Sequence, residues 1–175
     1  MKYKNLKNDE IMLSGISEQS LVNGVGLRKV YFSQGCNHHC DGCFNPETWK
    51  FSGGKIFKIN DLVKELKKES YLDGISFSGG DPMEQADKFS SLAAEAKKMN
   101  LNIWCWTGYK WEELMIKAKD DKTIVSLLKN IDVLIDGRFV LKLKTDKCIY
   151  RGSSNQRIID VDQSFKKKKV VLFKI

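Results

Sequence analysis

The sequence predicts an α/β fold: a mostly parallel sheet with helical crossovers, in the form of a partial, open β/α barrel. The first observation is that short apolar segments typical of strands alternate four times with segments of helical periodicity. The second is that 175 residues fall short of the roughly 200 or more that a closed eightfold barrel needs. We expect a single domain over residues 1–175, with a motif-bearing core over about 21–162 and a basic extension over 163–175.

The elements follow from the order of the residues. Residues 1–12 are polar and are expected to form an irregular lead-in, and Arg28 opens a strand that ends in a glycine turn at Gly35. Asn60 is a suitable N-cap for the first helix. The later strands are predicted over 74–78, 101–106, 131–135 and 170–173, and the helices over 59–69, 86–99, 111–119 and 122–129.

Each predicted parallel strand ends in a loop of small or polar residues. The carboxyl ends of parallel strands lie on the same side of a sheet, where α/β proteins place their chemistry. Four loops from distant parts of the sequence should therefore converge on one cleft. They are Gly35-Cys36, Gly79-Gly80-Asp81, Thr107-Gly108-Tyr109 and Asp136-Gly137-Arg138.

The first of these loops carries three cysteines, Cys36, Cys40 and Cys43, with the spacing C-x3-C-x2-C. Three thiolates can hold an iron–sulfur cubane and leave one iron open for a substrate. With His38 or His39 as the fourth ligand, they can instead form a structural zinc site. A third interpretation is plain structural cysteine. The spacing favours the cluster over zinc and leaves all three open.

The net charge of +8 comes partly from four consecutive lysines, Lys166 to Lys169. A solvated basic surface explains such a run, and so does a docking patch for an acidic partner. No apolar run approaches the roughly 20 residues of a membrane helix, and no apolar segment of a secretory signal follows Met1. Five cysteines without a disulfide-like pattern predict a reducing, cytoplasmic setting.

The motifs together resemble those of the radical S-adenosylmethionine (SAM) superfamily, and in particular the activases of glycyl-radical enzymes that serve anaerobic ribonucleoside-triphosphate reductases. The likeness covers roughly residues 21–162. It is carried by six motifs in the same order: Asn23-Gly24-x-Gly-x-Arg28, Gln34-Gly35-Cys36, Cys43-Phe44-Asn45-Pro46-Glu47-Thr48-Trp49, Trp106-Thr107-Gly108-Tyr109, Asp136-Gly137-Arg138-Phe139 and Arg151-Gly152-Ser153-Ser154-Asn155-Gln156.

The resemblance implies a radical SAM oxidoreductase. Cys36, Cys40 and Cys43 would hold a [4Fe-4S] cluster, whose open iron would chelate SAM. Reductive cleavage of SAM would give a 5′-deoxyadenosyl radical that takes hydrogen from a glycine of the large reductase subunit and leaves a glycyl radical. A low-potential donor such as a flavodoxin would supply the electron. The cofactors carry most of this chemistry, and the protein binds and orients them.

The resemblance also assigns SAM contacts. Gly79 and Gly80 would meet the SAM amino group, and Gly42, Cys43 and Phe44 would lie against the adenine. Contacts to the ribose or carboxylate would come from the loop residues Thr107, Asp136 and Arg138.

Two other functions compete with this one. The first keeps the radical chemistry but changes its target to another glycyl-radical enzyme or to a small-molecule substrate. The second, of a different class, is a zinc-stabilised module that binds nucleic acid. We expect neither a nucleic acid nor a membrane as partner, because the glycine loops and the strand–helix alternation favour the activase. Lys166–Lys169 are hypothesised to help dock the reductase.

Overall fold

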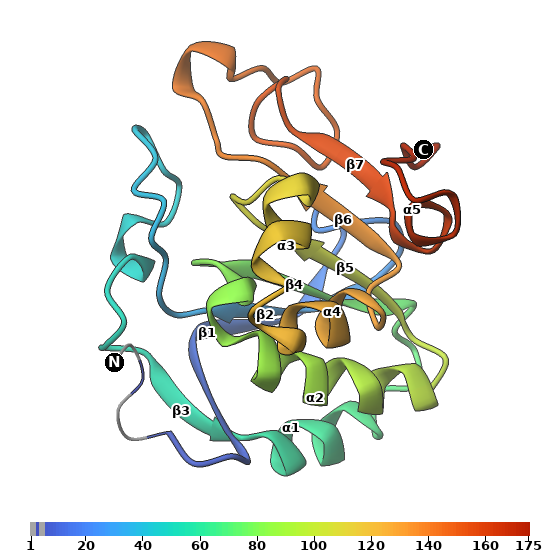
Figure 1. The fold of residues 1–175 in the computed structure, drawn as a ribbon. Coiled ribbons are helices and arrows are strands. Elements are labelled where there is room, and N and C mark those ends of the chain that lie inside the picture. Colours follow the sequence, from blue (N-terminus) through green and yellow to red (C-terminus); the bar gives the residue numbers. More distant parts are fainter. Residues whose placement is uncertain (1–2, 4–5) are drawn as a thin grey trace.

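The structure is a computed structural model that describes residue 3 and residues 6–175. Within this part of the chain one sheet has the strand order β3-β1-β2-β4-β5-β6-β7 (Figure 1). Its strands are β1 (Glu10–Ser20), β2 (Arg28–Ser33), β3 (Lys55–Lys58), β4 (Gly74–Gly79), β5 (Asn102–Trp106), β6 (Val133–Asp136) and β7 (Arg157–Asp160). The α-helices are α1 (Ile59–Leu66), α2 (Ala86–Lys98), α3 (Trp111–Lys117), α4 (Lys122–Leu128) and α5 (Val161–Lys167), and the 3-10 turns are η1 (Pro46–Thr48), η2 (Pro82–Gln85) and η3 (Leu141–Leu143).

The centre of the sheet is parallel, as predicted. Strands β2, β4, β5 and β6 pair in parallel in that order. The sheet as a whole is mixed, because β1 pairs antiparallel with both β2 and β3, and β7 pairs antiparallel with β6. The expectation of a mostly parallel sheet is therefore corrected to a mixed, open sheet of the α/β class.

The connections between the strands differ at the two antiparallel margins of the sheet. A parallel crossover needs a dozen or more residues, and the β1–β2 connection spans only residues 21–27. The β6–β7 connection, residues 137–156, is long enough for a crossover but contains the turn η3 and no α-helix, and β7 pairs antiparallel with β6. The irregular lead-in predicted over residues 1–12 is wrong from Glu10 onward, and its residues 1, 2, 4 and 5 lie outside the described part of the chain.

Helices α1 to α4 lie on one face of the sheet (Figure 1). Their apolar sides and the strands form the larger core, which includes Leu62, Phe89, Leu92 and Leu127. The four predicted helices are confirmed, and each ends earlier than predicted. The N-cap of α1 is Lys58 and not Asn60. The cap moves because β3 ends at Lys58, so the helix begins directly at Ile59.

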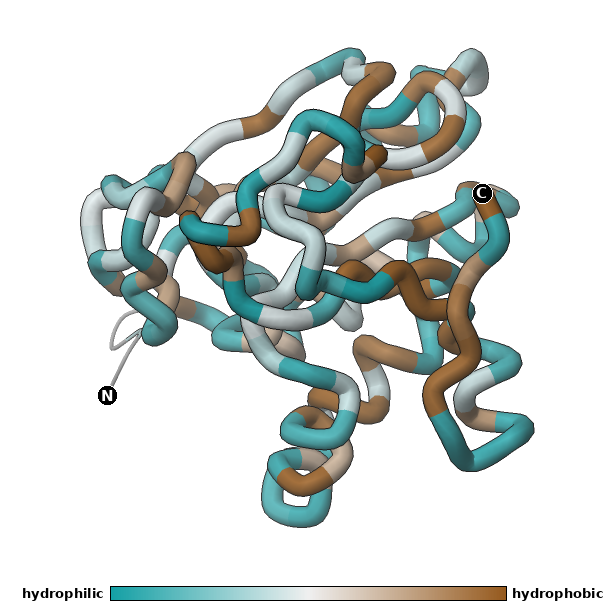
Figure 2. The backbone as a smooth tube through the Cα atoms, turned by 90° about the horizontal axis from the view of Figure 1, so that it is seen from above, coloured by the Kyte–Doolittle hydropathy of each residue, from teal (hydrophilic) through white to brown (hydrophobic). Residues whose placement is uncertain are grey.

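The opposite face of the sheet carries a small aromatic cluster. Along β5, Ile103 and Cys105 point into the larger core, whereas Trp104 and Trp106 point to the other side, as the alternation of a strand requires. Figure 2 shows hydrophobic and hydrophilic residues interspersed along the chain.

The C-terminal part contains two elements that the sequence did not predict, β7 and α5. The strand expected over 170–173 is reduced to a single bridge between Ile159 and Leu172. Lys166 and Lys167 lie in the last turn of α5, and the left-handed Lys168 ends that helix. Among the described residues, no helix combines the length and the apolar character that crossing a bilayer requires.

Candidate functional site

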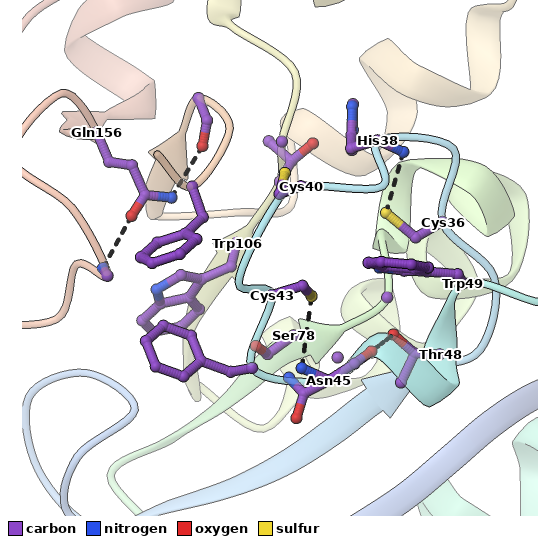
Figure 3. A pocket seen from close by; sticks show the side chains of 18 residues that line it. Cys36, His38, Cys40, Cys43, Asn45, Thr48, Trp49, Ser78, Trp106 and Gln156 are labelled. Atoms are coloured by element: carbon purple, nitrogen blue, oxygen red, sulfur yellow. Dashed lines mark hydrogen bonds between the residues drawn. The ribbon is translucent and has the colours of Figure 1, made fainter. Parts of the chain in front are cut away.

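A cleft of about 250 Å³ opens at the carboxyl ends of the four parallel strands (Figure 3). The pairing of Ser33 with Gly79, and of Trp106 with Ile135, brings these strand ends level with one another. All four predicted loops contribute to the cleft, so their convergence is confirmed. The lining residues are Cys36, His38, Cys40, Cys43, Phe44, Asn45, Thr48, Trp49, Ser78, Gly79, Gly80, Trp106, Thr107, Gly108, Gly137, Phe139, Gly152 and Gln156.

The three clustered cysteines face this cleft as free thiols (Figure 3). Backbone N–H groups point at two of the sulfurs: His38 N donates to Cys36 Sγ and Asn45 N donates to Cys43 Sγ, each at 3.4 Å. Burial raises the pKa of the Cys36 thiol to about 12 and also raises the pKa of Cys40. Burial thus favours the neutral thiol at Cys36 and Cys40, whereas a nearby positive charge would favour the thiolate.

The donor set fits an iron–sulfur cluster. Three cysteine sulfurs from one loop line one cleft, and thiolates are the usual ligands of such clusters. Among the residues that the structure describes, no three His, Cys, Asp or Glu side chains are grouped closely enough to hold one metal ion, as a zinc site requires. A cluster does not need that grouping, because each cysteine binds a different iron.

Backbone hydrogen bonds anchor the start of the cysteine loop. Gly35 N donates to Thr48 O at 2.8 Å, and Cys36 N donates to Trp49 O at 3.2 Å. The buried amide of Gln34 donates to Lys50 O at 2.7 Å. The segment after the cysteines thus folds back over the end of β2, which fixes where Cys36 enters the cleft.

A buried carboxylate ties the same loop to the neighbouring strands. Asp81 Oδ2 lies 2.7 Å from His38 Nε2 and accepts from Gly108 N at 3.0 Å. The Thr107 hydroxyl donates to the same carboxylate, and Met83 N donates to Asp81 Oδ1 at 2.9 Å. The His38 ring also packs edge-on against Tyr109, with ring centroids 4.4 Å apart. One side chain therefore connects the cysteine loop, η2 and the end of β5.

The two histidines of the loop differ. The side chain of His38 is only 4% exposed, whereas His39 is exposed to solvent. The sequence did not identify the His38–Asp81 pair; the only available signal was that both residues belong to the loops expected to converge.

Gly79 and Gly80 pack against the end of β2 and the start of the cysteine loop. Gly79 has φ +90°, a conformation that L side chains rarely adopt. A Cβ added at Gly80 would lie 2.5 Å from Gly35 O. Both glycines line the cleft with bare backbone, which lets a ligand approach closely.

We expect Gly80→Ala to lower the free energy of unfolding by about 1–3 kcal/mol, because its Cβ overlaps backbone that must move away. Gly15→Ala is the matched control, because nothing lies within 4 Å of a Cβ at Gly15. Denaturant unfolding of both variants measures the difference. Equal unfolding free energies for the two variants would show that the contact at Gly80 is not tight.

Aromatic side chains form a wall of the cleft. Phe44 packs against Phe139 with ring centroids 5.0 Å apart, and Trp106 Nε1 donates to Tyr150 O at 2.9 Å. Gln156 closes this side, because its amide donates to Gly137 O and accepts from Gly152 N, both at 2.8 Å. Trp106, Phe139 and Gln156 were part of quoted motifs but were not predicted as site residues.

The remaining predicted site residues are placed differently. Thr107 lines the cleft, but its hydroxyl is committed to Asp81. Asp136 is buried outside the lining, where it pairs with Arg157 and accepts from Trp111 N at 2.7 Å. Gly42 and Arg138 are exposed and also lie outside the lining. The structure thus brings the cysteines, Phe44, Gly79, Gly80 and Thr107 together, and leaves Gly42, Asp136 and Arg138 at the periphery.

Comparison with known proteins adds an independent finding. A family profile described as "4Fe-4S single cluster domain" matches residues 22–159. The chain is 41% identical to the anaerobic ribonucleoside-triphosphate reductase-activating protein of Enterobacteria phage T4 over 144 residues, which cover 78% of this chain and 86% of that protein. The proteins of the same name from Haemophilus influenzae and Escherichia coli K12 are 37% and 39% identical, and the matches cover 79% and 78% of this chain and 90% of each relative.

Proposed function

The chain belongs to the family of anaerobic ribonucleoside-triphosphate reductase-activating proteins, and on that premise we propose that it activates the catalytic subunit of such a reductase as a radical SAM enzyme. The observation that carries the proposal is the set of three free thiols in one cleft at the ends of four parallel strands. We also infer that the open sheet is the partial barrel of that superfamily.

Cys36, Cys40 and Cys43 would hold the [4Fe-4S] cluster. Such a cluster, when bound and reduced, would supply the electron for reductive cleavage of SAM to methionine and a 5′-deoxyadenosyl radical, and that radical would take hydrogen from a glycine of the reductase. The protein positions the three thiols through the anchored loop and the His38–Asp81 pair. Phe44, Phe139 and Trp106 give one side of this space an apolar wall.

The SAM contacts are proposals of different strength. Gly79, Gly80, Cys43 and Phe44 line the cleft, which supports contacts to SAM from their backbone or ring. Contacts from Gly42, Thr107, Asp136 and Arg138 stay predictions from the family resemblance. A low-potential donor such as a flavodoxin, and a location in the cytoplasm, are proposed on the same basis.

The experiment that tests this function is anaerobic. The protein is reconstituted with iron and sulfide, reduced with dithionite and given SAM, and 5′-deoxyadenosine is measured. The reductase catalytic subunit is then added, and a paramagnetic glycyl signal is expected. Absence of 5′-deoxyadenosine from protein that has bound iron would refute the radical SAM proposal. Product without a glycyl signal on the reductase would point to another target.

A further inference from the structure

A set of exposed apolar side chains lies on the cysteine loop and on the segment that follows β6, next to the cleft. Phe44 and four residues of the segment 138–151 belong to it, and between 36% and 61% of each residue's surface is exposed. We call this segment, which follows β6, the rim segment. Its four exposed apolar residues are Val140, Leu141, Leu143 and Ile149. Apolar surface gathered on one loop in this way is typical of a site that contacts another molecule.

The rim segment is continuous with the cysteine loop. Phe139 lines the cleft and packs on Phe44, and the Lys144 ammonium lies 5.4 Å from the centre of the Phe44 ring. Leu141 packs beside Gly42, since a Cβ added there would lie 2.9 Å from Leu141 Cδ1. The exposed apolar surface therefore begins at the mouth of the cleft.

Hydrogen bonds hold the rim segment in place. Val140 N donates to Ser153 Oγ at 3.1 Å, and Ser154 N donates to Leu143 O at 2.9 Å. Asn155 Nδ2 donates to Arg138 O at 2.9 Å. These bonds fix the backbone while the apolar side chains still face solvent, so the surface is formed before any partner binds, which lowers the entropic cost of binding.

The rim segment is also strongly basic. It contains five cations, Arg138, Lys142, Lys144, Lys147 and Arg151, and one acid, Asp146, so its net charge is +4. Among the residues that the structure describes, the side chains of Lys142, Lys144 and Lys147 have no carboxylate partner. An apolar centre with charged residues around it fits an acidic protein surface with an apolar centre of its own.

We propose that the rim segment, together with Phe44, is the docking surface for an acidic, partly apolar face of the reductase catalytic subunit. This inference rests on the proposed function, because hydrogen abstraction from a protein glycine requires that glycine to reach the cleft. A partner that docks on the rim segment is held directly at the cleft mouth. The lysine run at 166–169, which the sequence suggested for this role, lies instead at the end of α5.

The first test removes exposed apolar side chains that do not line the cleft. The reconstituted Leu143→Ser/Ile149→Ser variant is compared with Ile116→Ser/Leu172→Ser, whose two residues are 64% and 60% exposed elsewhere on the chain. The dissociation constant for the reductase subunit is measured under anaerobic conditions. We expect about 10-fold or more weaker binding for the first variant, and a change of less than about 2-fold for the second. Equal binding by the two variants would overturn the proposal.

The second test compares two sets of lysines. Lys142→Gln/Lys144→Gln/Lys147→Gln is expected to weaken binding at low salt and to reduce its dependence on salt. Lys166→Gln/Lys167→Gln/Lys168→Gln removes the same charge. This variant should leave the affinity at low salt and its dependence on salt unchanged. If only the second triple variant loses affinity, docking belongs to the C-terminal lysines and the rim proposal is wrong.

Formation of 5′-deoxyadenosine without the reductase separates this inference from the proposed function. The rim variants should keep this activity at the level of the unmodified protein, because neither set of residues lines the cleft. Normal SAM cleavage and normal reductase binding in the variants would overturn the docking surface alone. Failure of the unmodified protein to cleave SAM, or to bind the reductase, would overturn the proposed function and the docking surface with it.

Discussion

Cys36→Ala, Cys40→Ala and Cys43→Ala are each expected to lose the bound cluster and SAM cleavage together. Each substitution removes one of three thiolates, and no other cysteine lines the cleft within the described residues. Loss of an outer-shell partner already costs roughly 10–100-fold in metal affinity or activity, and the loss of a direct ligand should cost more. Iron content, visible absorbance and 5′-deoxyadenosine formation measure the effect.

Cys148→Ser is the matched control for these variants. Cys148 is also a free, partly buried thiol, but it does not line the cleft. The control should bind about as much iron and form about as much product as the unmodified protein. If a Cys40→Ala variant keeps full iron content and full activity, the cysteine loop does not hold the cluster and its proposed role is refuted. A Cys148→Ser variant that loses iron would place an unrecognised ligand outside the cleft.

The parallel centre of the fold was predictable because its signals are local. In β5, for example, the short apolar stretch that ends at Trp106 is visible without knowledge of its neighbours. The antiparallel margins depend on contacts between distant residues. Only the first part of β1 alternates regularly, with Ile11 and Leu13 buried, and β7 is four residues long, so neither segment carries a strong pattern of its own.

The site was predictable to a similar degree. The convergence of four loops follows from parallel topology alone, so Cys36, Gly80 and Thr107 could be brought together from the sequence. The hydrogen-bond or ion-pair partner of each loop side chain could not be predicted. Asp136 pairs with Arg157 on the adjacent antiparallel strand, which the sequence did not identify as a strand. The His38–Asp81 pair likewise needs the exact path of the cysteine loop.

The Asp81 carboxylate should be the most sensitive position outside the cysteines. Asp81 is completely buried and accepts hydrogen bonds from Met83 N, Thr107 Oγ1 and Gly108 N besides its contact with His38. Asp81→Ala leaves these buried donors without an acceptor. Removal of one partner from a buried charged network costs about 3–5 kcal/mol, so we expect a loss of that size in the free energy of unfolding.

Asp81→Asn should be almost as damaging, and it separates hydrogen bonding from side-chain volume. Donors approach both carboxylate oxygens, so the amide NH₂ of an asparagine would face a donor in either orientation. Denaturant unfolding of the metal-free and the reconstituted protein measures the loss, with the exposed Asp120→Asn as the control, expected within about 0.5 kcal/mol of the unmodified protein. The His38→Gln/Asp81→Asn double variant should lose less than the sum of the single losses, with a coupling of about 1–3 kcal/mol. Strict additivity would mean that His38 and Asp81 act independently, and that the cysteine loop is held by its backbone anchors alone.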